Sequence, residues 1–341
     1  MLTNALAKCN KSVKSSFICY MRKNVKHIIL TIFLLFNSLI HAQQQNNSFI
    51  VEVAGLHDSL YYQFVQNKQI YSGGWDTLEQ PKFWRSLMTM SADSALINIG
   101  CTRQIIKKVK LSEWNKLSDS YKDCYRDSVR TYYNLPIETR VFVTNGKKFF
   151  YDFENVIPTI SRGIEIFNNN NVDPFYAQAI LLIESPNALQ KSNVGAYGSF
   201  QIMKKVAVNL GLKVNKYEDE RKDFDKSAWA AAKLIRTICI PELNKILDDY
   251  CISYDPTDMW YRLMVMHVYH AGAGNVRKVM GIINPREGNM DLITTLWKTE
   301  AGGFRNASQN YSQLVLASLL ELDHIIHNNC KYIYYCNLDE I

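Results

Sequence analysis

Glu184 is the residue whose surroundings most favour acid–base chemistry. It ends an apolar stretch that starts after Asp173 and Pro174, a pair typical of a helix N-cap and a first helical position. Pro186 predicts that the helix stops here, because the residue before a proline avoids helical geometry. The negative end of the helix and the apolar neighbours both disfavour the ionised carboxylate. Glu184 is therefore a candidate general acid; the alternative is a glutamate that reaches solvent at a helix end.

Four segments, in this order along the chain, carry a family resemblance. The first joins Glu184-Ser185 to the Gly-Ala-Tyr-Gly-Ser-Phe-Gln-Ile-Met run at 195–203. The others are an acidic-Arg segment before an alanine-rich helix (219–232), Tyr-His-Ala-Gly-Ala-Gly-Asn-Val (269–276), and Asn-Tyr before an apolar helix (310–311). Over residues 150–325 the chain resembles the lytic transglycosylases of the soluble type. Each segment alone is a weak signal, and the four in order are a specific one.

The resemblance implies a lysozyme-like fold and an enzyme that cleaves peptidoglycan glycan strands. Ordinary glycosidases use two carboxylates, whereas enzymes of this family use a single glutamate. That glutamate protonates the bond between N-acetylmuramic acid and N-acetylglucosamine. It then acts as a base on the muramoyl 6-hydroxyl, so that a 1,6-anhydro ring closes without water. No cofactor and no metal are implied.

Residue-by-residue carry-over assigns the acid to Glu184 and cleft positions to five other residues. Ser199 and Gln201 fall where the family lines the cleft beside the glutamate, and an amide offers donors and an acceptor to an acetamido group. Tyr269 falls where the family's tyrosine points its hydroxyl towards the acid, with a core aromatic as the alternative. Tyr311 matches the last motif tyrosine, with the same role, and His270 follows Tyr269 in its motif.

The chain departs from the family pattern at several positions. His270 stands where asparagine is usual, and an imidazole titrates near neutrality whereas an amide does not. The pair Ser199-Phe200 replaces two apolar residues, and the neutral Ala307 and Ser308 replace an acidic residue and a threonine. These changes leave the acid in place, so the sequence still predicts an enzyme.

Two other functions fit parts of this pattern. A goose-type lysozyme has a related fold but hydrolyses its substrate, and it would need a second carboxylate to hold a water; Asp219, Glu220 and Asp223 are the candidates. A glycan-binding protein that holds the strand without cutting it is the other alternative, and the substitutions at His270 and Ala307 keep it open. The reaction products separate the two enzymes, and Glu184→Gln separates an enzyme from a binding protein.

The first 42 residues are predicted to be a cleaved signal peptide. Met21 to Lys26 form a basic start, His27 to Ile40 are mostly apolar, and a polar run of glutamines and asparagines follows Ala42. Met21 is an alternative first residue. The apolar run is shorter than the roughly 20 residues of a spanning helix. We therefore expect an exported protein of the periplasm or cell envelope, or a secreted one, with no stable membrane anchor after cleavage.

Most of the charge of +7 belongs to the predicted leader rather than to the mature chain. Of the 39 basic residues, six lie in residues 1–42, which hold no acidic residue, and the others nearly balance the 32 acidic residues. The mature chain thus lacks the basic excess of a nucleic-acid-binding protein. No histidine spacing indicates a metal site and no phosphate-binding loop is present.

Cysteine usage agrees with export. Six of the eight cysteines follow the leader, an even number that suggests disulfides. Fifteen pairings are possible, so the sequence leaves the pairing open. Proximity along the chain favours Cys330–Cys336, with weaker predictions for Cys239–Cys251 and Cys101–Cys124.

Residues 43–145 are predicted to form a mostly helical region of unknown role. Helices are expected over 83–90, 92–110 and 111–133, the last capped by Ser112. Trp75, Trp84 and Trp114 are interpreted as core residues rather than sugar-stacking ones. Asn145-Gly146 between two strand-like runs predicts a hairpin over 140–152, at the join to the next domain.

Residues 146–327 are predicted to be the lysozyme-like catalytic domain, followed by a tail at 328–341. Helices are expected over 156–167, 204–210 with Gly211 as C-cap, 226–240 ended by Pro241, 258–269, 276–283 and 308–326. Few strand signals occur in this part. The predicted fold class is therefore mainly α, with a helical catalytic domain, a smaller N-terminal region and a short hairpin between them.

Overall fold

The computed structural model describes residues 48–55, 60–184, 192 and 195–335, and these belong to one compact unit. The predicted signal peptide, Ser185 and Cys336 lie outside the described residues. No helix among those described is long and apolar enough to cross a membrane. The predicted boundaries at 145/146 and 327/328 stay predictions.

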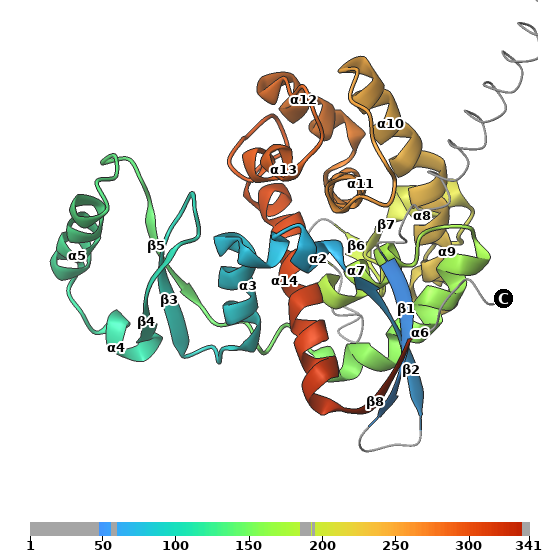
Figure 1. Ribbon diagram of the computed structural model, residues 1–341, viewed down its shortest axis with the longest axis horizontal. Helices are drawn as coiled ribbons and strands as arrows, with labels where there is room; N and C mark the ends of the chain where they lie inside the picture. Colours follow the sequence, from blue (N-terminus) through green and yellow to red (C-terminus); the bar gives the residue numbers. More distant parts are fainter. Residues whose placement is uncertain (1–47, 56–59, 185–191, 193–194, 336–341) are drawn as a thin grey trace, which may run out of the picture. The chain divides into compact units, whose positions relative to one another are not determined.

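Helices make up most of the described chain, which confirms the mainly α fold class (Figure 1). In the C-terminal part they are α6 (Phe153–Asn169), α7 (Phe175–Glu184), α8 (Lys204–Leu210), α9 (Phe224–Leu234), α10 (Ile240–Asp249), α11 (Met259–Ala271), α12 (Ala273–Ile283), α13 (Met290–Leu296) and α14 (Asn306–Asn329). The expected helices at 156–167, 204–210, 258–269, 276–283 and 308–326 are confirmed, and Gly211 caps α8 in a left-handed conformation.

The central helix of the site is α7, which is buried on every side. All its residues from Phe175 to Ile183 are buried, and it packs against α6 and α14. Asp173 accepts a hydrogen bond from the backbone N–H of Phe175 and pairs with the buried guanidinium of Arg262. A helix that is apolar all round is stable only inside a core, so α7 carries Glu184 to the edge of that core.

One predicted helix end is wrong. Pro241 does not stop the helix that begins at α9, because a π-helical turn at Ile235–Cys239 leads directly into α10, where Pro241 lies in the first turn. A proline in the first turn removes an N–H that would have no partner there. The N-cap of α9 is Asp223, whose carboxylate accepts a hydrogen bond from Lys226 N.

The N-terminal region contains more strand than predicted. β1 (Ser48–Gly55) pairs antiparallel with β2 (Tyr61–Asn67) and with β8 (Cys330–Tyr335), so the two ends of the described chain share one sheet of order β2-β1-β8. The helices that follow are α2 (Gln69–Ser72) and α3 (Glu79–Thr89), and α3 packs along α14. The predicted helix at 83–90 is thus confirmed within α3.

The predicted helix at 92–110 is wrong, because this stretch forms β3 (Ser94–Ile99) and β4 (Ile105–Lys110). Ala95 to Ile99 are all buried, and a short continuous apolar run suits a central strand as well as a helix. The single helix expected at 111–133 is divided into α4 (Leu111–Asn115) and α5 (Asp119–Tyr132), because Ser118 caps α5 by accepting from Tyr121 N.

The predicted strand before Asn145 is confirmed, but the strand predicted to pair with it is wrong. β5 (Val141–Asn145) pairs with β3 rather than with the residues after Gly146, giving a sheet of order β4-β3-β5. Gly146 donates its N–H to the carbonyl of Ser94, and a Cβ there would lie 2.2 Å from the carbonyl oxygen of Ser91. Gly146 is therefore explained by the close approach of two backbone segments, which leaves no room for a side chain. The hairpins of this region are β1–β2 and β3–β4.

The β4-β3-β5 sheet and its two helices enclose a small core of their own, formed by Ile97, Trp114, Val129 and Val141. Arg103, in the β3–β4 turn, reaches away from this core and donates to Asn310 at the start of α14 (3.2 Å). Trp75, Trp84 and Trp114 are all buried, which confirms their interpretation as core residues.

The two weaker disulfide predictions are wrong. Cys101, Cys124, Cys239 and Cys251 are all free thiols. Cys239 lies buried in the π-helical turn while Cys251 is exposed beyond α10, so the ten-residue helix between them separates a core position from a surface one. Cys330–Cys336 stays a prediction, because Cys336 and the Cys330 side chain lie outside what the structure describes.

Candidate active site

Glu184 lies at the C-terminal end of α7, in a setting that favours its neutral form. Part of its surface reaches solvent, and protein atoms surround the rest of the side chain. Burial raises the pKa of Glu184 to about 7, although a hydrogen bond from Tyr311 acts in the opposite direction. A carboxyl group that titrates near neutrality can give a proton and take it back at physiological pH.

Tyr311 brings α14 into contact with the acid. Its hydroxyl donates to Oε1 of Glu184 at 3.1 Å, and its ring is buried in the core. Burial and the nearby carboxylate both raise the pKa of Tyr311 well above its usual value, so the hydroxyl remains a donor. The structure thus brings together two of the residues carried over from the family motifs.

Tyr269, on α11, lies close to Glu184 but bonds elsewhere. Its hydroxyl donates to the backbone carbonyl of Phe200 at 2.6 Å. Burial raises the pKa of Tyr269, and the charge of Glu184 adds to the increase, which places the two groups near each other. In this structure Tyr269 therefore joins α11 to the turn that carries Ser199 and Gln201.

Ser199 and Gln201 lie in the tight turn between β6 (Ala196–Tyr197) and β7 (Ile202–Met203). Ser199 is buried, and Gln201 has a left-handed backbone with φ of 46° and donates its side-chain amide to the carbonyl of Gly198 (3.1 Å). Gly198 also has positive φ, and a Cβ there would lie 1.8 Å from the Arg221 carbonyl oxygen. The turn thus depends on glycine and on contact with Arg221.

The Arg221 side chain holds the β6–β7 hairpin in place through hydrogen bonds. Its guanidinium is buried, forms two hydrogen bonds with the Asp219 carboxylate, and donates to the carbonyls of Gly195 and Ile202. The acidic-Arg segment therefore has a structural role at the β6–β7 hairpin.

A known protein family matches the segment that holds most of these residues. Residues 164–289 match the family model described as the transglycosylase SLT domain. This segment is an SLT transglycosylase domain. No curated protein matches the chain closely enough to count as a relative. At the level of the family, the SLT domain is lysozyme-like and marks a transglycosylase-type enzyme that acts on the peptidoglycan of the cell wall.

The matched segment of the SLT domain contains Glu184, Ser199, Gln201, Tyr269 and His270, whereas Tyr311 lies beyond it. His270 lies in the last turn of α11, with its ring stacked on that of Tyr311, the centroids 4.2 Å apart and the planes at 21°. The surrounding protein lowers the pKa of His270, although part of the ring is exposed. His270 thus touches the tyrosine that bonds Glu184, as an uncharged ring near neutral pH.

Tyr151 is a neighbour of Glu184 that the sequence reasoning missed. It precedes α6, outside the matched segment, and its side chain is buried. Burial raises the pKa of Tyr151, and the charge of Glu184 raises it further. The aromatic run around it was interpreted as a strand, so no motif distinguished this tyrosine from its neighbours.

The three carboxylates considered for a hydrolase are all engaged in structural contacts. Asp219 pairs with Arg221, Glu220 accepts from Lys226 Nζ (2.7 Å) and Lys213 N (2.6 Å), and Asp223 caps α9. Among the described residues, no second carboxylate contributes to the pKa of Glu184. No group of His, Cys, Asp and Glu in the described chain could hold a metal ion.

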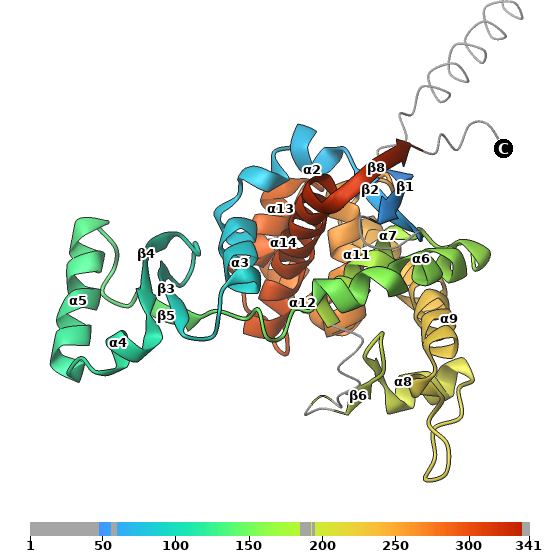
Figure 2. The ribbon, with the colours of Figure 1, turned by 90° about the horizontal axis from the view of Figure 1, so that it is seen from below.

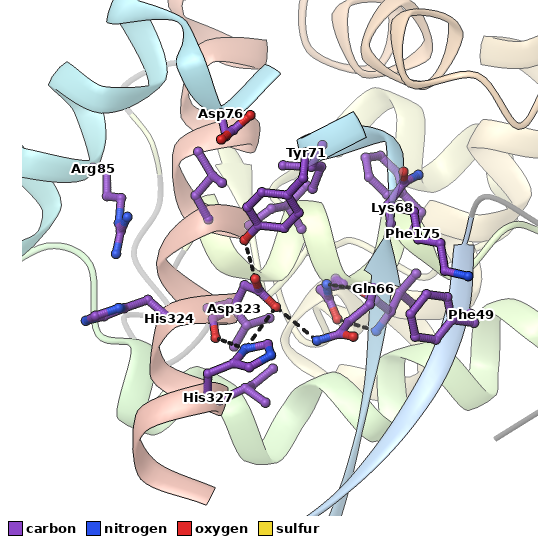
Figure 3. A pocket seen from close by; sticks show the side chains of 18 of the residues that line it. Phe49, Gln66, Lys68, Tyr71, Asp76, Arg85, Phe175, Asp323, His324 and His327 are labelled. Atoms are coloured by element: carbon purple, nitrogen blue, oxygen red, sulfur yellow. Dashed lines mark hydrogen bonds and ion pairs between the residues drawn. The ribbon is translucent and has the colours of Figure 1, made fainter. Parts of the chain in front are cut away.

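A cavity of about 630 Å³ lies elsewhere, between β2, α2 and the end of α14, and contains none of the six predicted site residues (Figure 3). On its wall the Asp323 carboxylate accepts from Gln66 Nε2 at 2.9 Å and from the Tyr71 hydroxyl. These hydrogen bonds join side chains of β2, α2 and α14 to one another. The candidate active site is therefore the group around Glu184.

Proposed function

We propose that the protein is a lytic transglycosylase that cleaves the β-1,4 bond between N-acetylmuramic acid and N-acetylglucosamine without water. The observation that carries this proposal is a single carboxyl group, Glu184, with its pKa raised to about 7 by burial and with a tyrosine hydroxyl bonded to it. Hydrolytic glycosidases instead use a second carboxylate to activate water or to attack the sugar.

In the first step, protonated Glu184 gives its proton to the glycosidic oxygen, and the bond from that oxygen to C1 of the muramoyl sugar breaks. The N-acetylglucosamine leaves as an alcohol, and positive charge develops at C1. The Tyr311 hydroxyl, at 3.1 Å, stabilises the carboxylate that this step produces. The substrate's 2-acetamido group assists at C1.

In the second step, the Glu184 carboxylate takes the proton of the muramoyl 6-hydroxyl, and that oxygen bonds to C1. The product is a 1,6-anhydro-muramoyl end, and Glu184 is protonated again. Ser199 and Gln201 are proposed to bind the strand from the β6–β7 turn, with Tyr269 holding the turn against α11. His270 is proposed to line the cleft through its stack on Tyr311.

The proposed setting is the periplasm or cell envelope, or the cell exterior, after removal of residues 1–42. The partner is the peptidoglycan glycan strand, with no nucleic acid, no cofactor and no lasting membrane anchor. Residues 146–327 would be the catalytic domain, preceded by residues 43–145, whose role is unknown, and followed by a tail at 328–341.

Mass spectrometry of the fragments that the purified protein releases from sacculi tests the reaction. Anhydro-muramoyl ends, lighter than reducing ends by one water, are expected. Reducing ends would instead identify a goose-type muramidase, and binding without release would identify a glycan-binding protein.

A further inference from the structure

The first turns of α14, on both sides of Tyr311, consist largely of buried polar residues. Each of these residues is at most 9% exposed: Ser308, Gln309, Asn310, Ser312 and Gln313. A buried polar side chain is stable only when it is hydrogen-bonded, so its partners fix where it can lie. The partners found here lie on several other elements, so tertiary contacts fix the position and rotation of the helix around Tyr311.

One set of contacts comes from the C-terminal part of the chain. Ser312 Oγ lies 2.8 Å from Nε2 of His267 on α11, and it accepts from Nε1 of Trp297, just after α13, at 2.7 Å. Gln309 Nε2 donates to the carbonyl of Thr299 at 3.1 Å. One side of α14 is therefore bonded to α11 and to the segment that follows α13.

The other set comes from the N-terminal region of unknown role, which lies outside the matched SLT segment. The indole N–H of Trp84, on α3, donates to Gln313 Oε1 at 2.9 Å, and both side chains are buried. Arg103 donates to Asn310 Oδ1 at 3.2 Å. Figure 2 shows α3 lying beside α14. The N-terminal region thus bonds to α14 on either side of Tyr311, at positions 310 and 313.

Arg103 is held against α3 as well as against α14. Its guanidinium carbon lies 5.4 Å from the ring centroid of Phe83 and 5.6 Å from that of Trp84. A guanidinium over an aromatic face is attracted by the ring. Arg103 and Trp84 therefore contact each other, and together they form one surface against the start of α14.

We propose that Trp84 and Arg103 are positioning residues, which hold the start of α14 where the Tyr311 hydroxyl reaches Glu184. The buried ring of Tyr311 leaves its hydroxyl to follow any displacement of the helix. Its bond to Glu184 is 3.1 Å long, and a lengthening of about 0.5 Å would lose it. The inference rests on the proposed function, in which this bond acts on the acid. The N-terminal region thereby completes a site whose acid lies in the SLT segment.

Trp84→Phe and Arg103→Met test the inference, because each removes the hydrogen-bond donor and keeps a large side chain. Each should lower kcat by about 10–100-fold, the worth of a hydrogen bond to a charged group, and leave KM near that of wild type. Each should also move the alkaline limb of the pH–rate profile upward, as expected for Tyr311→Phe. Kinetics on glycan strands prepared from sacculi measure both effects.

Trp114→Phe and Arg126→Met are the matched controls. Trp114 belongs to the separate small core, and Arg126 pairs with Asp123 within α5. Both controls should keep the wild-type kcat and pH profile. Control variants with effects equal to those at Trp84 and Arg103 would overturn the inference.

A Tyr311→Phe background separates positioning from general destabilisation. The hydroxyl is already absent there, so Trp84→Phe and Arg103→Met should cause no further loss of kcat and no further movement of the limb. Losses that add to that of Tyr311→Phe would show that the two residues contribute to stability alone.

A measurement without substrate separates this inference from the proposed function. In an NMR titration of the Glu184 carboxyl carbon, both variants should raise its pKa, because the Tyr311 bond lowers it. The titratable neighbours Tyr151, Tyr269 and His270 are the same in all these proteins.

If the pKa of Glu184 rises in the variants but wild type releases no anhydro product, the positioning holds and the reaction is wrong. If wild type is active and the variants keep its pKa and pH profile, the positioning is wrong. A pKa that falls towards 4.5 would show that the substitution has exposed Glu184 to water, and it too would overturn the inference.

Discussion

The hydroxyl of Tyr311 and the carboxyl group of Glu184 are joined by a 3.1 Å hydrogen bond between residues 127 positions apart. Burial raises the pKa of Glu184 to about 7, and this bond alone counteracts the increase. The acid is thus held between two opposing effects. In the proposed mechanism, burial keeps its proton available for the leaving oxygen, and the tyrosine stabilises the anion that remains.

Glu184→Gln should abolish the release of fragments from sacculi. An amide cannot donate and recover a proton, so activity should fall by at least about 10²–10⁴-fold. Mass spectrometry of released fragments measures the loss. Retained release in this variant would contradict the single-acid mechanism.

Thermal unfolding provides the control for Glu184→Gln. The folded pKa of Glu184 is raised from 4.5 to about 7, so the folded state binds more protons between these values and wild-type stability falls as pH rises through them. At pH 8 the neutral variant should therefore be at least as stable as wild type, and at pH 4 the two should be similar. A variant that unfolds at every pH would make the loss of activity uninformative.

Tyr311→Phe should move the alkaline limb of the pH–rate profile upward. Its hydroxyl lowers the pKa of Glu184, so its removal leaves the acid protonated to higher pH. The first step needs the protonated acid, and kcat/KM of wild type should fall as pH rises through about 7, near the pKa of Glu184. The pH dependence of kcat/KM for both proteins measures the shift. A limb that stays in place or moves downward would show that Tyr311 does not act on Glu184.

His270→Asn tests whether the imidazole contributes a charge or only a stacked ring. A cation at His270 would favour ionised Glu184 and oppose positive charge on the sugar, giving the profile an acid limb. Because the surrounding protein lowers the pKa of His270, that limb should lie below the usual range of histidine. The variant should lose this acid limb and keep the alkaline one.

His324→Asn is the control for this variant, since His324 lies on α14 at the cavity away from Glu184. It should leave the whole profile unchanged. If His270→Asn also leaves it unchanged at normal stability, the ring contributes packing on Tyr311 and no charge.

Asp219→Asn should destabilise the protein because it leaves the Arg221 guanidinium buried without its counter-ion. Losing one partner of a buried ion pair costs about 3–5 kcal/mol, and here the β6–β7 hairpin loses its support. Denaturant unfolding measures the cost. Asp225→Asn, which breaks an exposed pair with Arg162, is the control and should cost about 1 kcal/mol or less. A stable but inactive Asp219→Asn would instead favour a hydrolase with Asp219 as the second carboxylate.

Much of helix α7 could be predicted from the sequence because its signals are local. Asp173 and Pro174 mark the start of α7, the apolar run marks burial, and Pro186 marks the end beside Glu184. The motif at 195–203 singled out Ser199 and Gln201 as candidate cleft residues. A cap, a proline or a helical period acts over a few residues, so it can be read without the fold.

Only the tertiary structure determines which strands pair and which side chains form hydrogen bonds with each other. Ser94–Ile99 reads equally as helix or strand, and only pairing with β4 and β5 settles it. Nothing local directs the Tyr269 hydroxyl to the Phe200 carbonyl or places Tyr151 beside the acid. The sequence indicated that the pKa of Glu184 is raised, but the size of the increase depends on how much water the helices around it exclude. Desolvation is a property of packing between α7 and α14, and no short segment carries it.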